Sequence, residues 1–125
     1  MIEDRKGFVI KEDAMGEITV ADEVVAIIAG IATTEVEGVS SMAGNITNEL
    51  VAKLGMKNLS KGVKVEMNDN EVSVMVSINV AFATNVPDVS YKVQQKVKAS
   101  IENMTGLTVS EVNVKIAGID VGKDN

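Results

Sequence analysis

The stretch GVKVEMNDNEVSVMVSINVAF, residues 62–82, has the most regular hydrophobic pattern in the sequence. Apolar residues alternate with charged ones over 63–67, and aliphatic or aromatic residues then occupy every second position over 72–82. An alternation with a period of two is typical of β-strands that bury one face. The polar residues Asn68–Asn70 between the two segments favour a turn. The stretch therefore predicts a β-hairpin whose second strand is long enough to lie at the centre of a sheet.

The sequence after this hairpin predicts a helix and a closing strand. Pro87 suits the first turn of a helix, where its missing N–H has no helical partner in any case. Gly106 suits the end of the helix, and residues 112–116 again alternate as a strand, before a polar tail at 119–125 that we expect to be frayed. The apolar residues of the helix recur three or four positions apart and predict one buried face: Val89, Val93, Val97, Ile101 and Met104.

The sequence before the hairpin predicts a second long helix. Residues 1–15 have a weak pattern, in which 7–12 form an edge strand or an extended tail, and 17–20 predict a short strand or an entry segment before the helix. Thr19 and Asp22 have the spacing of a capping box that opens the helix, and Gly38 is placed to end it. Its predicted buried face consists of Val20, Val24, Ile27, Ile28 and Ile31. A short amphipathic helix is predicted at 45–54.

These elements predict an α+β fold. Their order, β-α-(short α)-β-β-α-β, is split βαβ-like and is satisfied by two main helices packed on one face of a three- to four-stranded mixed sheet. The chain has 125 residues, which is enough for one hydrophobic core, and no linker divides it. We therefore expect residues 1–125 to form a single domain.

Composition excludes several classes of function. The chain has no histidine, cysteine or tryptophan, so it lacks the commonest acid–base group, soft metal ligands and the best base-stacking side chain. With 12 basic against 18 acidic residues, the net charge of −6 disfavours nucleic acid and anionic membranes as partners. The longest apolar run, 24–32, is about half of the roughly 18 residues that a membrane span needs. We therefore expect no direct membrane insertion.

The chemical motifs in the sequence are incomplete. Residues 38–44 imitate a nucleophile elbow, but Met42 occupies the place of the second glycine. The oxygen-rich segment 68–71 lacks the twelve-residue calcium loop and favours a turn. The neighbouring acids Glu35 and Glu37 are typical of a solvated helix end. We expect no enzymatic activity, no metal and no cofactor, and a binding or structural role remains.

Two stretches together resemble the alkaline shock protein family, a general-stress, cell-envelope-associated family of Gram-positive-type bacteria. Residues 16–39, GEITVADEVVAIIAGIATTEVEGV, are similar to the opening of the family pattern. Residues 93–116, VQQKVKASIENMTGLTVSEVNVKI, are similar to its closing signature. The chain departs from the pattern at 82–85, where many members have an aromatic residue followed by glycine and this chain has Ala83.

The resemblance implies a small non-enzymatic protein of cell-envelope homeostasis that responds to stress. Such proteins are cytoplasmic or lie at the membrane periphery through a membrane-anchored protein, and they associate with themselves into homo-oligomers. The family-motif residues have structural explanations as helix ends and strand core, and they are Glu35, Val36, Gly38, Val39, Thr105, Gly106, Val112, Asn113 and Val114. Asn113 is the exception, because it alternates with two core valines and is predicted to point to the opposite face of the sheet.

Three functions stay open at this point. The first is a scaffold or adaptor that associates with itself and docks a membrane-anchored protein. The second is a cytosolic regulator that binds an enzyme of lipid or envelope metabolism or its small-molecule effector. The third is an enzyme, whose turnover would be lost when a carboxylate such as Glu35 or Asp69 is neutralised.

Overall fold

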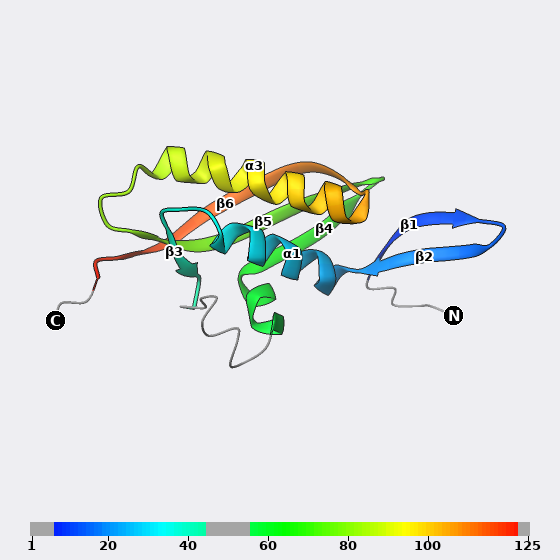
Figure 1. Ribbon diagram of the computed structural model, residues 1–125, viewed down its shortest axis with the longest axis horizontal. Coiled ribbons are helices and arrows are strands. Elements are labelled where there is room, and N and C mark those ends of the chain that lie inside the picture. Colours follow the sequence, from blue (N-terminus) through cyan, green and yellow to red (C-terminus); the bar gives the residue numbers. More distant parts are fainter. Residues whose placement is uncertain (1–6, 45–55, 123–125) are drawn as a thin grey trace.

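The computed structural model describes residues 7–44 and 56–122 (Figure 1). The predicted helix at 45–54 lies outside these residues. The elements follow in the order β1 (Gly7–Asp13), β2 (Gly16–Ala21), α1 (Asp22–Thr34), β3 (Val39–Met42), the 3-10 helix η1 (Met56–Gly62), β4 (Val63–Asn68), β5 (Glu71–Ala81), α3 (Val86–Thr105) and β6 (Thr108–Asp120).

Strand β5 is the centre of a four-stranded mixed sheet. Strand β4 pairs antiparallel with its first half and β3 with its second half, along the same edge. Strand β6 pairs parallel with β5 along the other edge, over Glu71–Ala81. The predicted hairpin is confirmed, and its turn contains Asp69 at φ 58, a left-handed conformation that Asp tolerates.

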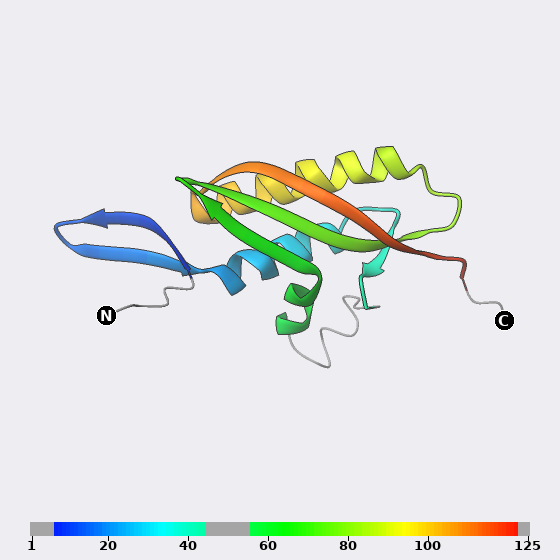
Figure 2. The same cartoon turned by 180° about the vertical axis from the view of Figure 1, so that it is seen from behind.

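Helices α1 and α3 pack side by side on one face of this sheet, as Figure 1 shows. In Figure 2, the view from behind, the strands lie in front of both helices and no described helix covers their outer face. The core between the two layers is mainly aliphatic, and the side chains of β5 that point into it are Val72, Val74, Val76, Ile78 and Val80. The predicted α+β fold, with two helices on one face of the sheet, is confirmed.

Strands β1 and β2 form a separate two-stranded antiparallel sheet. This hairpin projects from the body next to the start of α1, at the end of the molecule opposite to the C-terminal end of β6 (Figure 1). The segment 7–12, predicted as an edge strand or a tail, is therefore a strand that pairs with β2 and not with the main sheet.

The predicted capping box at the start of α1 is wrong. Helix α1 begins at Asp22, its N-cap residue is Ala21, and no side chain caps it. Thr19 is still part of β2, where it pairs with Val9, and its hydroxyl donates to Glu17 Oε1 at 3.5 Å. Because Thr19 remains in the strand, its side chain does not reach the first turn of the helix.

The predicted buried face of α1 is partly wrong. Ile28 is buried as predicted, but Val24 is exposed and Ile27 and Ile31 are only half-buried. The buried residues of the helix are mostly small and are Val25, Ala26, Ile28, Ala29, Gly30, Ala32 and Thr33. A Cβ on Gly30 would lie 2.9 Å from Leu59 Cβ, so the missing side chain lets η1 approach closely. An almost uniformly apolar helix has too little contrast for periodicity to identify its packed face.

The ends of the helices follow turn geometry. Gly38 was predicted to cap α1, but the C-cap is Glu35 in a right-handed conformation. Gly38, at φ 103, lies in the turn that enters β3. Gly106 caps α3 as predicted, at φ 80. Met104, which was predicted on the buried face of α3, is exposed, and Thr105 is buried instead. At the far end, β6 continues to Asp120, two residues into the predicted tail.

Candidate functional site

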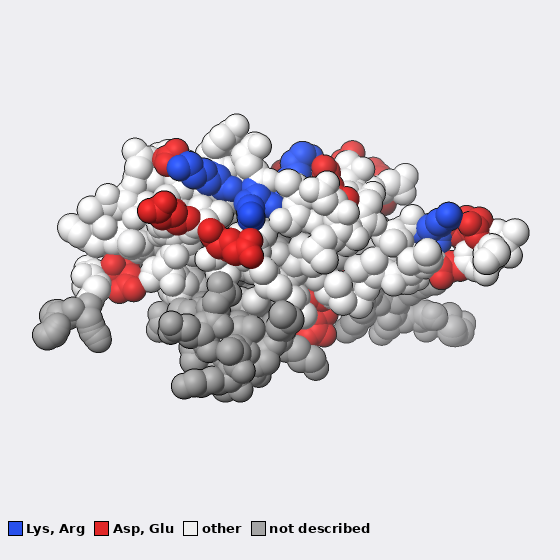
Figure 3. All heavy atoms as spheres, in the orientation of Figure 1, with Lys and Arg blue, Asp and Glu red and all other residues white. Residues whose placement is uncertain are grey.

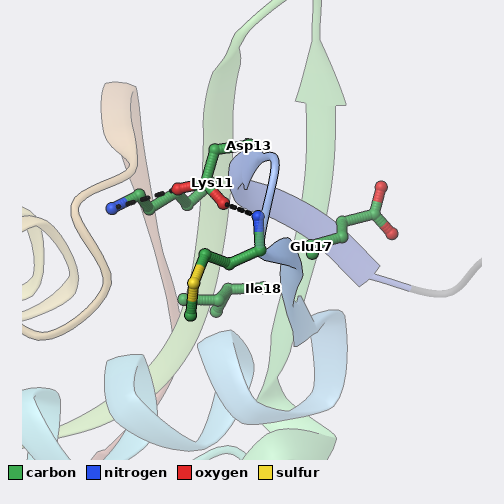
Figure 4. A pocket seen from close by; sticks show the side chains of 6 residues that line it. Lys11, Asp13, Glu17 and Ile18 are labelled. Carbon is green, nitrogen blue, oxygen red and sulfur yellow. Dashed lines mark hydrogen bonds and ion pairs between the residues drawn. The ribbon is translucent and has the colours of Figure 1, made fainter.

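The projecting hairpin carries a shallow pocket of about 310 Å³, lined by Lys11, Asp13, Met15, Gly16, Glu17 and Ile18. Figure 4 shows these side chains around the turn between β1 and β2. Asp13 holds the turn together, since its Oδ1 accepts a hydrogen bond from the Met15 amide at 2.9 Å. Its Oδ2 lies 3.5 Å from Lys11 Nζ. Met15 and Ile18 remain exposed. The pocket therefore offers apolar contacts with a charged rim, which suits protein binding.

The outer face of the sheet is a second candidate surface. Alternation along the strands directs polar side chains to this face, because the valines between them point to the helices. It contains a hollow of about 180 Å³ lined by Lys64, Glu66, Ser73, Met75, Glu111 and Asn113. Glu111 Oε2 accepts hydrogen bonds from Ser73 Oγ at 3.5 Å and from Asn113 Nδ2 at 3.3 Å. Asn113 thus points to the face opposite the core, as predicted.

The helix face carries mixed charges. Figure 3 shows basic and acidic side chains close together along α3 and on the hairpin. Lys96 Nζ lies 3.4 Å from Glu35 Oε1 and so links α3 to the end of α1, and Lys92 Nζ lies 3.2 Å from Asp88 Oδ2. These pairs are exposed and contribute little stability, about 0–1 kcal/mol each. Among the described residues on the face in view, no strongly basic or acidic patch is present.

The carboxylate of Glu102 reaches the sheet edge. Glu102 of α3 accepts a hydrogen bond from the backbone N–H of Val109 at 2.8 Å and from Lys98 Nζ at 3.0 Å. The Val109 hydrogen bond and then Lys98 hold the pKa of the Glu102 carboxyl below its ordinary value, against an opposing effect of desolvation. The carboxylate therefore fixes the start of β6 to the last turns of α3.

The family-motif residues lie in two groups at opposite ends of α3. Gly38 packs against Val89 in the first turns of α3, since a Cβ there would lie 2.5 Å from Val89 Cγ2. Thr105 ends the same helix, and 20 residues of helix span about 30 Å. The structure therefore does not bring the two groups together into one site.

Within the first group, Glu35 faces Lys96, Val36 is buried, and Val39 pairs with Val80 in the sheet. Within the second group, the Thr105 hydroxyl donates to Ile101 O at 2.7 Å and accepts from the Leu107 amide at 3.0 Å. Gly106 is the helix cap, Val112 is buried and Val114 is half-buried. A structural role for these residues stays a prediction, and the effect of Gly38→Ala on the free energy of unfolding tests it.

Two features were missed from the sequence. The first is the exposed hairpin with Met15 and Ile18, because the hydrophobic pattern there is weak and does not reveal that β1 pairs with β2. The second feature is the contact of Lys98 and Glu102 with Val109, which lies 11 positions from Lys98 and 7 positions from Glu102. The spacing of four between Lys98 and Glu102 signals an ion pair, but it gives no sign of the strand beside it.

Comparison with known proteins agrees with this architecture. The family model of the alkaline shock protein family, described as having a cell envelope-related function, matches residues 10–121. The match covers most of the chain, including both candidate surfaces and both groups of motif residues. This chain belongs to that family.

Relatives in Bacillus and Streptococcus are similar along most of the chain. The uncharacterized protein YqhY of Bacillus subtilis (strain 168) is 39% identical over 105 residues, which cover 84% of this chain and 78% of YqhY. YloU of the same organism is 32% identical over 85% of this chain and 90% of YloU. A stress response regulator gls24 homolog of Streptococcus pyogenes (serotype M3) is 31% identical over 83% of this chain and 59% of that protein.

Solved structures support the fold alone. Two variants of MamM CTD have a TM-score of 0.50 with this chain, at 13% and 12% identity. The similarity covers 79% of this chain in both comparisons, and 96% and 98% of those chains. At this level of identity the likeness concerns architecture and not activity.

Proposed function

We propose that this chain is a non-enzymatic scaffold or adaptor of the cell envelope, which associates with itself and docks to a membrane-anchored protein. The family has a cell envelope-related function, and relatives carry the name of a stress response regulator. The proposal adds to this a mode of action, which is binding between proteins.

The observation that carries the proposal is the hairpin of β1 and β2. Two-stranded hairpins are marginally stable alone in water, so exposed apolar side chains on such an arm are costly unless a partner covers them. Val9, Met15 and Ile18 are all exposed on it. The outer face of the sheet offers a further surface that no described helix covers. Both features suit docking of another protein.

The proposed location is the cytoplasm, at the membrane periphery through the partner. No helix in the described part of the chain is long and apolar enough to cross a membrane. Attachment to the membrane would therefore come from the anchored protein, which the tip of the hairpin would contact.

The experiment has two readouts. The first is sedimentation velocity of the pure chain over a hundredfold range of concentration, where growth into larger species is expected. The second is membrane fractionation of cells that express the chain with Ile18→Asp, compared with Met104→Asp as a matched control on the exposed end of α3. We expect Ile18→Asp alone to shift the protein from the membrane fraction to the supernatant. A wild-type chain that never sediments with membranes would exclude docking.

A second candidate is a cytosolic regulator that binds an enzyme of lipid or envelope metabolism. The observation in its favour is the name of the Streptococcus relatives, which is that of a stress response regulator. This candidate predicts a strict monomer that forms a complex of fixed stoichiometry with the enzyme.

An enzymatic role would require turnover that Glu35→Gln or Asp69→Asn abolishes, and Glu35 is engaged in an ion pair with Lys96.

A further inference from the structure

Strand β6 forms one outer edge of the sheet, and its first half is covered. Among the described strands it pairs with β5 only. The Val109 carbonyl accepts a hydrogen bond from Lys98 Nζ at 2.9 Å, and the Val109 amide donates to Glu102 Oε2 at 2.8 Å. The Val112 carbonyl accepts from Gln94 Nε2 at 3.1 Å. These side chains of α3 occupy the backbone groups that another strand would use, so no strand can add there.

In the part of the chain that the structure describes, no strand pairs with the outward edge of the second half of β6, which is therefore called open. Residues of a strand point their backbone groups alternately to the two edges, so Val114 and Ile116 point outward like Val112. The register with β5 shifts after Ile116, where Gly118 becomes the partner of Asn79 and Ala117 is the extra residue of a bulge. The Asp120 carbonyl accepts from the Phe82 amide on the β5 side, so Ile119 points outward. The bulge therefore places both Ile116 and Ile119 on the open edge.

The surroundings of this open edge are apolar. Phe82, Ile119 and Val121 are exposed by 68%, 60% and 76%. Phe82 lies beside Asp120 through the hydrogen bond between their backbones. A hollow of about 400 Å³ is lined by Asn79, Gly118, Ile119, Asp120 and Val121. Large apolar side chains around an open strand edge are typical of a place where a further strand adds.

Charge selects a second copy of the chain as the added strand. Lys115 and Asp120 lie on the outer face of the sheet, since their partners Ser77 and Ala81 alternate with the buried residues of β5. If two copies of β6 pair antiparallel with Ile116 opposite Ile119, Lys115 of each copy lies opposite Asp120 of the other. Both isoleucines then lie on the helix side of the sheet and both charged residues on its outer side. Because the dimer is two-fold symmetric, each of these pairs occurs twice.

We propose that the open half of β6 pairs antiparallel, over Lys115–Asp120, with the same segment of a second copy, in the register that places Lys115 opposite Asp120. This interface rests on the proposed self-association and gives it a location. The pairing joins two sheets of four strands edge to edge and covers Phe82, Ile119 and Val121. An isologous contact of this kind closes at a dimer, so growth beyond two copies would need another surface.

The test is a charge exchange between copies, measured by sedimentation velocity of the full chain at low salt. Lys115→Glu places two carboxylates opposite each other at both ends of the interface, and Asp120→Lys places two ammonium groups there. We expect each variant alone to dimerise about tenfold or more weakly than the wild type. In an equimolar mixture of the two variants, both pairs are again of opposite charge, and dimers should return at the wild-type level.

Two controls separate charge from folding. Lys61→Glu makes the same change of charge on an exposed residue of η1, next to β4 and away from β6, and should leave dimerisation unchanged. The Asp120 carboxylate also accepts hydrogen bonds from Ser40 Oγ at 2.6 Å and the Gly122 amide at 3.0 Å, so Asp120→Lys is compared with Ser40→Ala by thermal unfolding. Lys115→Glu changes an exposed side chain and is informative even if Asp120→Lys folds poorly.

The outcomes are distinct. Weakening by each variant with recovery in the mixture supports the interface. A wild type that self-associates while neither charge reversal weakens it, or while the mixture stays weak, overturns this register but leaves the proposed scaffold standing. A wild type that remains monomeric over the whole concentration range overturns both the interface and the self-association.

Discussion

Gly38→Ala is the substitution for which the structure gives the clearest cost. Gly38 has φ 103, a conformation in which a side chain costs roughly 1–2 kcal/mol. The new Cβ would lie 2.5 Å from Val89 Cγ2 and 3.2 Å from Thr84 Cγ2, which adds overpacking of about 1–3 kcal/mol. The lower entropy of the unfolded chain with alanine offsets about 0.4–1 kcal/mol. We therefore expect the free energy of unfolding to fall by roughly 2–4 kcal/mol.

The assay is urea unfolding followed by far-ultraviolet circular dichroism, in a double-mutant cycle with Val89→Ala. Truncation of Val89 removes the nearest contact but not the backbone strain, so Gly38→Ala should cost less in the Val89→Ala background than in the wild type. A loss of stability below about 0.5 kcal/mol in the wild type would refute the reasoning from conformation and contact. An equal loss in both backgrounds would refute the contact with Val89 and leave the strain.

Three further substitutions test other parts of the fold. Ala83→Gly should raise the free energy of unfolding by about 0.5–1 kcal/mol, measured in urea, because Ala83 has φ 71 and glycine relieves that strain. Leu59→Ala should lower it by about 2–5 kcal/mol, because Leu59 is fully buried against α1; a loss under 1 kcal/mol would contradict that packing. The pKa of Glu102 is lowered in the folded state, so its contribution to stability is present at neutral pH, above its ordinary pKa, and is lost as pH falls through the folded value. Stability measured from pH 7 to pH 3 should therefore fall less steeply in Glu102→Gln than in the wild type, and equal slopes would contradict this.

Period-two alternation and helix ends made most of the fold predictable. The hairpin of β4 and β5, the helix from Pro87 to the Gly106 cap and the strand after it appear in the sequence because each has one buried and one solvated face. Even the departure at Ala83 keeps the local geometry, since its φ of 71 is one that glycine adopts readily.

The elements that sequence did not predict depend on contacts between distant residues. Strand β3 was missed because it contains serines, which are common in turns. Ser41 is nevertheless buried, and its Oγ accepts a hydrogen bond from Asn79 Nδ2 at 2.9 Å. The packed face of α1 depends on Leu59 of η1, and the covered half of β6 depends on side chains from α3. The candidate surfaces could not be predicted for the same reason, because their exposure depends on how distant parts of the chain pack.

The separation of the β1–β2 hairpin from the main sheet has a consequence for amide hydrogen exchange. Strand β5 has hydrogen-bonded neighbours on both edges, so the amides that it donates to these strands should exchange only through global unfolding. Among the described strands, β1 and β2 pair only with each other, so their amides should open locally, with a much smaller free energy. In the free chain the arm would thus be the first part to exchange and the first that a protease cuts near Met15. Binding at the hairpin would slow both events there and leave the exchange of β5 unchanged.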